Sequence, residues 1–197
     1  MIADDLFFLG NGHVHVPHLG IALGAGLLAD LVLSGRIGVS EHGRLAIYDR
    51  QPTGWPFADS VLGALITSPD TALGEWLRII GSDAWDRVSG GLLASGTLRR
   101  VTTRKLLVPV TKLEPADPEL LGRLRARLRY AVHAGELTEA DAALICLAQV
   151  LQIEGRAFLD GVPKTVSALA GALHPALRTI VTTASATIAS NATSAYR

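Results

Sequence analysis

The stretch that most constrains this chain runs from Leu19 to Leu33 and reads LGIALGAGLLADLVL. It is apolar except for Asp30, and several of its residues are small: Gly20, Ala22, Gly24, Ala25, Gly26 and Ala29. Each glycine inside a helix costs about 1 kcal/mol relative to alanine, so close packing must offset that cost. The stretch therefore predicts a buried helix whose backbone touches its neighbours.

The composition agrees with a helical protein. Hydrophobic residues make up 49% of the 197 residues and aromatic residues only 5%, so the core is built from Leu, Ala, Val and Ile. Lys+Arg and Asp+Glu both number 18, so no excess charge attracts nucleic acid, and we expect no such partner. The single cysteine, Cys146, excludes an internal disulfide and lies in an apolar run, which predicts burial.

No export or membrane-spanning segment is evident. The chain begins with Asp4 and Asp5 rather than the basic start of a signal peptide. No run of about 18 uncharged apolar residues exists, since Asp30 and Arg36 interrupt the best candidate. We expect a cytoplasmic protein that meets a membrane, if at all, from the inner face.

Apolar residues recur at helical spacing along most of the chain. Beyond Leu19–Leu33, helices are expected at 59–66, 71–80, 83–94, 119–134, 139–153, 164–173 and from 175 to about 189. Residues 2–9 fit either a short helix or an extended segment. The sequence thus predicts a mainly α protein, a compact single-domain helical bundle over residues 1–190 with a tail at 191–197.

Two β-hairpins interrupt the helices. The first pairs Arg36–Ser40 with Arg44–Asp49 and, coming after a helix, suggests a winged-helix-like unit. The second pairs Thr97–Val101 with Lys105–Thr111 around a turn at Thr102-Thr103.

Histidines and tryptophans are the residues that suggest a site. His13, His15 and His18 fit an exposed extended segment, metal ligands on one strand face, or a general base. Trp55, Trp76 and Trp85 fit either the core or a shared ligand pocket. No cysteine or carboxylate completes a metal set near the histidines, so we expect no metal and no cofactor. The chain also lacks Gly-x-Ser-x-Gly, His-Glu-x-x-His and phosphate-loop motifs, which leaves enzymatic activity open.

Several short motifs follow one another in a recognisable order. They are Gly35-Arg36, Pro52-Thr53-Gly54 with Asp59, Gly96-Thr97-Leu98, Leu106–Val110 and the apolar run Ala142–Val150. In this order and spacing the chain resembles the Golgi phosphoprotein 3 family, which has bacterial members. The resemblance implies a helical bundle that binds membranes peripherally and reads phosphatidylinositol 4-phosphate. It also implies that the hairpin at Thr97–Thr111 supports self-association and membrane contact.

The resemblance places the family's ligand pocket on residues of a different kind. The family's tryptophan falls at His15, and its three phosphate-binding arginines fall at Gly24, Ser82 and Trp85, while Trp55 replaces an acidic residue. The ligand-binding set predicted in this way is His15, His18, Gly24, Trp55, Ser82 and Trp85, with His15 as the candidate for any catalysis. We expect His15, Trp55 and Trp85 to converge on one pocket and phosphatidylinositol 4-phosphate not to be selected.

Two function classes remain open. The first is a peripheral lipid-binding adaptor that touches an anionic membrane and forms a homo-oligomer through the second hairpin, with Arg99, Arg100, Arg104, Lys105, Leu106 and Leu107. The second is a pocket repurposed to bind or transform a small, largely apolar metabolite.

Overall fold

The computed structural model describes residues 1–10, 16, 18–40, 42–105, 108–158, 161 and 163–194. Its α-helices are α1 (Ile2–Gly10), α2 (Leu19–Leu33), α3 (Pro56–Thr67), α4 (Leu73–Gly81), α5 (Ala84–Ala94), α6 (Leu120–Ala134), α7 (Glu139–Val150), α8 (Leu169–Ala172) and α9 (Pro175–Ser194). Its strands are β1 (Ile37–Val39), β2 (Leu45–Ile47), β3 (Leu98–Lys105) and β4 (Val108–Pro115). The predicted mainly helical fold with two hairpins is confirmed.

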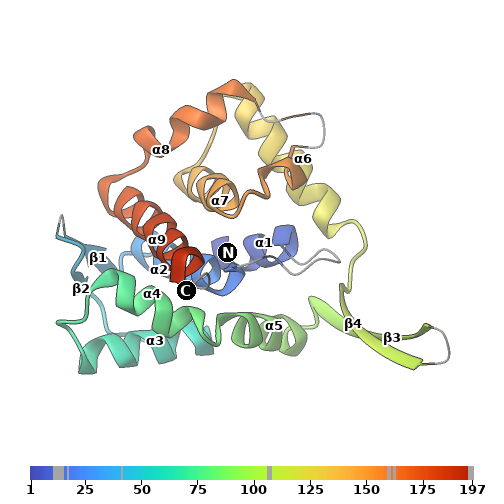
Figure 1. Cartoon of the computed structure of the whole chain (residues 1–197), viewed down its shortest axis with the longest axis horizontal. Coiled ribbons are helices and arrows are strands. Elements are labelled where there is room, and N and C mark those ends of the chain that lie inside the picture. The colour runs from blue at the N-terminus through green and yellow to red at the C-terminus, as the bar shows by residue number, and fades with distance from the viewer. Residues whose placement is uncertain are drawn as a thin grey trace.

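Helices α1 and α2 form the centre of the molecule. Figure 1 shows α1 enclosed by other helices, and Leu6 and Phe7 on it are completely buried. Helix α2 contacts α1, α4, α5, α7 and α9, and Leu23, Leu27 and Leu28 on it have no exposed surface. A helix that is apolar on every side must be covered on every side. The predicted burial is confirmed for most of α2, whereas Leu33 at its end is 40% exposed.

The small residues of α2 let its backbone touch α4. A Cβ atom added to Gly20 would lie 2.2 Å from the carbonyl oxygen of Gly81. In return, a Cβ atom added to Gly81 would lie 2.9 Å from the backbone nitrogen of Ile21. The two helices therefore pack backbone against backbone, and this contact offsets the helical cost of the glycines.

Charged side chains from distant parts of the chain hold both ends of α1. At the start, Asp30 of α2 accepts hydrogen bonds from the backbone N–H groups of Ile2 at 3.0 Å and Ala3 at 3.3 Å. At the end, the Arg156 guanidinium donates to the carbonyl oxygens of Leu9 at 3.4 Å and Gly10 at 3.0 Å. A negative group at the N-terminus and a positive group at the C-terminus both complement the helix dipole.

The first hairpin follows α2 directly. Gly35, with φ of +69°, ends the helix in the left-handed region that glycine adopts readily. Strands β1 and β2 then pair antiparallel, with Gly38 opposite Ala46. Arg36 forms an ion pair with Asp49 and donates to the carbonyl of Gln51 at 3.1 Å, so the guanidinium joins the two ends of the hairpin at its base.

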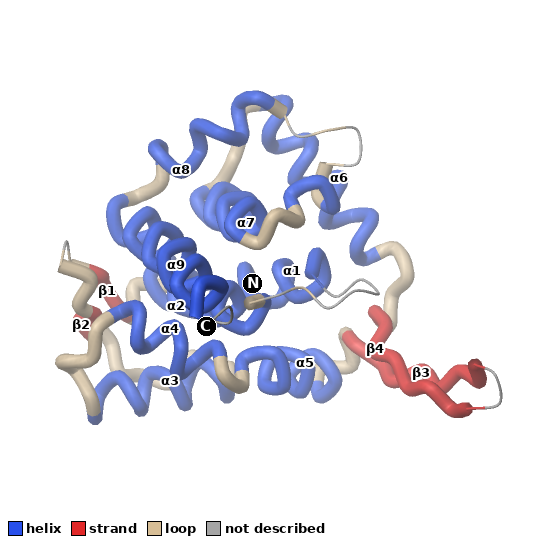
Figure 2. The backbone as a smooth tube through the Cα atoms, in the orientation of Figure 1, coloured by secondary structure: helices blue, strands red, loops and turns tan. Residues whose placement is uncertain are grey.

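The second hairpin is longer than expected and its turn lies elsewhere. Strands β3 and β4 pair over eight residues each, from Leu98 opposite Pro115 to Lys105 opposite Val108. The turn predicted at Thr102-Thr103 is wrong, because both residues lie within β3. Threonine is β-branched and favours a strand, and here it finds a partner in β4. Figure 2 shows the hairpin projecting from the end of α5, beyond the helices.

The region before α9 also differs from the expected helix at 164–173. It forms a 3₁₀ segment, Lys164–Ala168, followed by the short helix α8. His174 and Pro175 then separate α8 from α9, which continues to Ser194.

Candidate functional site

The projecting hairpin exposes basic side chains close to its base. Arg99 and Arg100 on β3 and Lys112 on β4 are exposed, whereas Leu98 is buried against the body of the molecule. Within the part of the chain that the structure describes, no carboxylate lies within ion-pairing distance of these three cations. The hairpin therefore presents positive charge that forms no ion pair among the described residues, although Glu114 lies opposite Arg99 in the strand register.

Further basic and apolar residues belong to the same hairpin. The backbones of Arg104 and Lys105 lie in β3, while their side chains fall outside the described part of the structure. Leu106 and Leu107, which connect the strands in the sequence, lie outside the described residues. From Leu98 to Pro115 the sequence holds five basic residues and one acidic residue, so this segment carries +4 in a chain of zero net charge.

Two of the predicted ligand-binding residues lie near the contact between α2 and α4. A Cβ atom at Gly24 would lie 3.1 Å from the Ile80 side chain and 3.5 Å from the nitrogen of Gly81. Ser82 follows directly as the C-cap of α4, and its hydroxyl donates to the Ile79 carbonyl at 2.7 Å. Gly24 is thus packed between helices, whereas Ser82 is exposed beside it.

The predicted tryptophans have separate partners. Trp85 on α5 is 40% exposed, and its ring centroid lies 6.0 Å from that of Phe7 on α1. Trp55, the N-cap of α3, meets Phe57 edge-on at 5.9 Å. Among the described residues no ring contact joins Trp55 to Trp85.

Of the two predicted histidines, His18 lies within the described residues and His15 does not. His15 lies outside the described residues, so its convergence with Trp55 and Trp85 stays a prediction. His18 has φ of 61° and is the N-cap of α2, where its carbonyl accepts a hydrogen bond from Ile21 at 3.1 Å.

A cleft of about 340 Å³ opens beside Ser82. Helices α3 and α4 supply mostly apolar walls, and the start of α5 closes one end; the lining includes Phe57, Val61, Trp76, Ile79, Ser82 and Arg87. The volume falls in the range of small-molecule sites, which combine apolar walls with a few polar groups.

Arg87 is the positively charged residue in the lining of this cleft, which we call the Ser82 cleft. Its guanidinium donates to Asp83 at 2.5 Å and to the Ser60 hydroxyl at 3.4 Å, and it lies 5.7 Å from the centroid of the Phe57 ring. The Trp76 indole nitrogen is buried and has no hydrogen-bond partner among the described residues. The cleft therefore combines the Arg87 guanidinium, which Asp83 and Ser60 hold in place, with the aromatic ring of Phe57.

The motif Pro52-Thr53-Gly54 has a structural role. Asp59 accepts hydrogen bonds from the Thr53 backbone N–H at 2.6 Å and from its hydroxyl at 2.7 Å. The same hydroxyl accepts a bond from the Trp55 N–H at 3.1 Å. These bonds favour the ionised carboxylate, and Thr53 accordingly lowers the pKa of Asp59. The motif thus fixes the start of α3.

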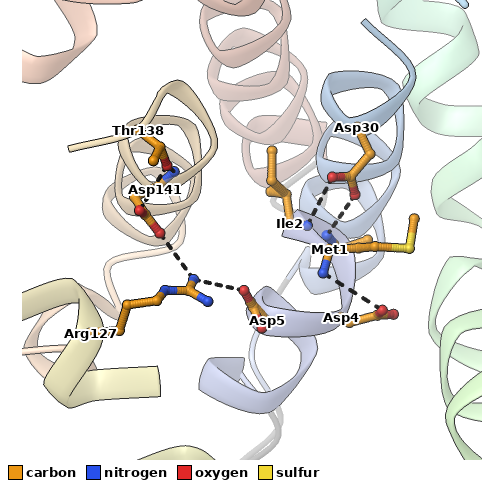
Figure 3. A network of polar contacts seen from close by, with 9 residues as sticks. Met1, Ile2, Asp4, Asp5, Asp30, Arg127, Thr138 and Asp141 are labelled. Atoms are coloured by element: carbon orange, nitrogen blue, oxygen red, sulfur yellow. Dashed lines mark hydrogen bonds and ion pairs between the residues drawn. The ribbon is translucent and has the colours of Figure 1, made fainter. Parts of the chain in front are cut away.

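Sequence reasoning missed a charge network around α1, shown in Figure 3. Arg127 of α6 bridges Asp5 of α1 at 2.9 Å and Asp141 of α7 at 3.0 Å. Thr138 donates to Asp141 at 2.7 Å, so that buried carboxylate has two partners. Two acidic residues in an otherwise apolar first helix were the available signal, but Arg127, the partner of Asp5, follows it by 122 residues.

The described part of the chain has neither a membrane-spanning helix nor a cluster of metal ligands. Among the described residues, no helix is long and apolar enough to cross a membrane. Within the same part of the chain, no three histidine, cysteine or carboxylate side chains gather closely enough to hold a metal ion.

Comparisons with known proteins settle the family. A search of curated proteins finds no match. The family model described as Golgi phosphoprotein 3 (GPP34) matches residues 2–190, which covers nearly the whole chain. Its match includes both hairpins, the motif that fixes α3 and every helix up to α9. The chain therefore belongs to the Golgi phosphoprotein 3 family.

Proposed function

We propose that this protein is a peripheral membrane adaptor that contacts anionic lipid through the β3–β4 hairpin. The observation that carries the proposal is the projecting hairpin with Arg99, Arg100 and Lys112 exposed and unpaired within the described structure. Family membership also supports this proposal, because the resemblance implies membrane contact by this hairpin. The inner face of the cell membrane, as an anionic surface, is the expected location.

The charge of the hairpin is large enough to matter. Each Lys or Arg close to an anionic bilayer contributes about 1 kcal/mol, and the hairpin holds five basic residues against Glu114. Apolar residues between the basic ones, Leu106 and Leu107, would add interfacial burial. Several weak contacts from one hairpin then sum to measurable, salt-sensitive binding.

The proposed contact responds to charge rather than to one headgroup. Gly24, Ser82 and Trp85 stand where the family resemblance places guanidinium groups, and none of them offers a charge-assisted bond to phosphate. Vesicles with phosphatidylinositol 4-phosphate should bind no better than vesicles of equal charge made with phosphatidylserine. A clear preference for the phosphoinositide at equal charge and physiological salt would contradict this.

Vesicle co-sedimentation tests the proposal itself. The full chain should sediment with vesicles containing about one third phosphatidylserine and remain free with neutral phosphatidylcholine vesicles. The double variant R99E/R100E should lose at least about tenfold in apparent affinity, because two attractive charges become repulsive.

A matched variant separates hairpin contact from overall charge. R50E/R78E makes the same charge change at two exposed arginines outside the hairpin. It should bind nearly as well as the parent protein. Equal losses in both double variants, or strong binding to neutral vesicles, would overturn the hairpin contact.

A second candidate function rests on the Ser82 cleft. Its apolar walls and the Arg87 guanidinium suit a small, largely apolar molecule that carries an acidic or polar group. Mass spectrometry of an organic extract of the purified protein tests this, with the cleft-filling variant Ala64→Trp as control. A molecule recovered equally from both proteins would not occupy this cleft.

A further inference from the structure

A second and larger cleft, of about 500 Å³, lies between α1, the end of α5 and α6. Its apolar lining comes from Phe8, Leu92 and Leu124, each 5–6% exposed. Its polar lining includes Asp4, Asp5 and the hydroxyl of Ser95. A space of this size with apolar walls and a few charged groups has the features of a site for an amphipathic small molecule.

The charged side chains that line this α1–α6 cleft differ in how closely they are paired with opposite charges. Arg123 pairs with Asp117 and Glu119, and Arg127 pairs with Asp5 and Asp141. Both guanidinium groups are therefore already matched to carboxylates. Asp4, in contrast, has only the chain's amino group within ion-pairing distance, at 4.0 Å, among the described residues. Asp4 is therefore the least closely paired charge in the lining, since the Met1 amino group lies at the limit of ion-pairing distance.

We propose that the α1–α6 cleft binds a small organic cation, an amine with a short apolar chain, whose ammonium group pairs with Asp4 and whose chain lies against Phe8, Leu92 and Leu124. The apolar lining excludes water from the chain and gives part of the affinity. The ammonium group gives the rest, because it can approach Asp4 more closely than the Met1 amino group, which lies 4.0 Å away. This site is separate from the hairpin and does not depend on membrane binding.

The groups around Asp4 favour the binding of a cation. The pKa of Asp4 is raised to about 6, chiefly by burial; the amino group of Met1 lowers it, and the Asp30 and Asp5 carboxylates add to the rise. The charged groups that line the cleft from α6 are Arg123 and Arg127, and the lining from α5 and its end, Leu92, Ser95 and Thr97, is uncharged. An ammonium group bound beside Asp4 relieves this repulsion between carboxylates.

A metal ion is a poorer occupant than an amine. Within the described residues no group of three metal-ligating side chains exists, so the carboxylates are too few or too far apart to coordinate one. An inorganic cation would also leave the apolar wall of Phe8, Leu92 and Leu124 uncovered.

Isothermal titration calorimetry with the full chain and hexylammonium chloride, without lipid, tests the proposal. At pH 7.5 hexylammonium should bind saturably and at least about tenfold more tightly than 1-hexanol or ammonium chloride, since each lacks half of the interaction. Asp4→Asn should weaken hexylammonium about tenfold or more. The exposed carboxylate variant Asp86→Asn should bind as the parent does.

The pH dependence gives an independent test. A carboxyl group with a pKa of about 6 is only about one-tenth ionised at pH 5, whereas hexylammonium stays charged. Affinity of the parent protein should therefore fall roughly tenfold from pH 7.5 to pH 5, and affinity of the Asp4→Asn variant should not change. Asparagine suits this site, because burial already favours the neutral form of Asp4.

Filling the cleft should also abolish binding. Ser95→Phe adds a ring to the lining without touching a charge, and it should remove the hexylammonium signal while circular dichroism stays unchanged. Hexylammonium that binds no better than hexanol, or equally well to the parent, Asp4→Asn and Ser95→Phe proteins, would overturn the proposal.

Discussion

Close backbone contact at Gly20 depends on a single missing methyl group. The carbonyl oxygen of Gly81 occupies the place where any side chain at position 20 would begin. Neither partner can yield by turning a side chain, because the opposing atoms belong to the backbone. Position 20 is therefore among the least tolerant in the chain.

Gly20→Ala should lower the free energy of unfolding by at least about 2 kcal/mol, since α2 and α4 would have to move apart. Gly63→Ala is the matched control: Gly63 lies inside α3, is exposed and has open space where its Cβ would be. That change should stabilise the protein by about 0.5–1 kcal/mol. Urea denaturation measures both, and equal effects of the two substitutions would contradict the close contact.

At the scale of elements, the start of α3 shows how a short motif directs local structure. The Thr53 hydroxyl both donates to Asp59 and accepts from the Trp55 N–H, so one side chain ties the loop to the helix. Pro56 at the first helical position has no N–H that would need a partner.

Thr53→Val keeps the shape of the side chain and removes both bonds of the hydroxyl. We expect a loss of about 1 kcal/mol in stability and faster amide hydrogen exchange from Trp55 to Asp59. Thr67→Val, which removes a single exposed bond to the Ala64 carbonyl at the other end of α3, should change neither by much. Unchanged exchange near Trp55 in the Thr53 variant would show that the backbone bond to Asp59 suffices.

Local patterns predicted most of the elements but not the contacts between distant parts of the chain. The apolar spacing located most of the helices, because this signal acts within a few residues. The turn at Thr102-Thr103 was misplaced because pairing with β4 decides where β3 ends. The Arg127 network was missed because Asp5 and Asp141 come together only in the folded chain.

At the scale of the whole molecule, charge is separated although the total is zero. The hairpin segment from Leu98 to Pro115 carries +4, so the rest of the chain carries −4. A dipolar protein of this kind turns its positive end toward an anionic surface as it approaches. The described strands of the same hairpin project away from the body, with Leu98 buried at the base. Two-stranded units of this kind are marginal alone in water.

That marginal stability leads us to expect self-association through the hairpin. Light scattering should give a homo-oligomer mass for the parent protein, and Leu107→Asp should shift it toward monomer by placing a charge in the apolar part of the hairpin. Leu33→Asp, at a 40% exposed leucine on α2, is the control and should leave the mass unchanged. A monomer mass for the parent protein would end this expectation.

Asp30 and Arg156, which bind the two ends of α1, bear on how the chain folds during its synthesis. Asp30 follows Ile2 by 28 residues, so the start of α1 finds its partner soon after both leave the ribosome. Arg156 follows Leu9 by 147 residues, and the end of α1 must wait for it. Until then α1 and α2, the most apolar helices of the protein, expose hydrophobic surface that later helices such as α7 and α9 will bury. This nascent pair is the stretch on which we expect chaperones to act during synthesis.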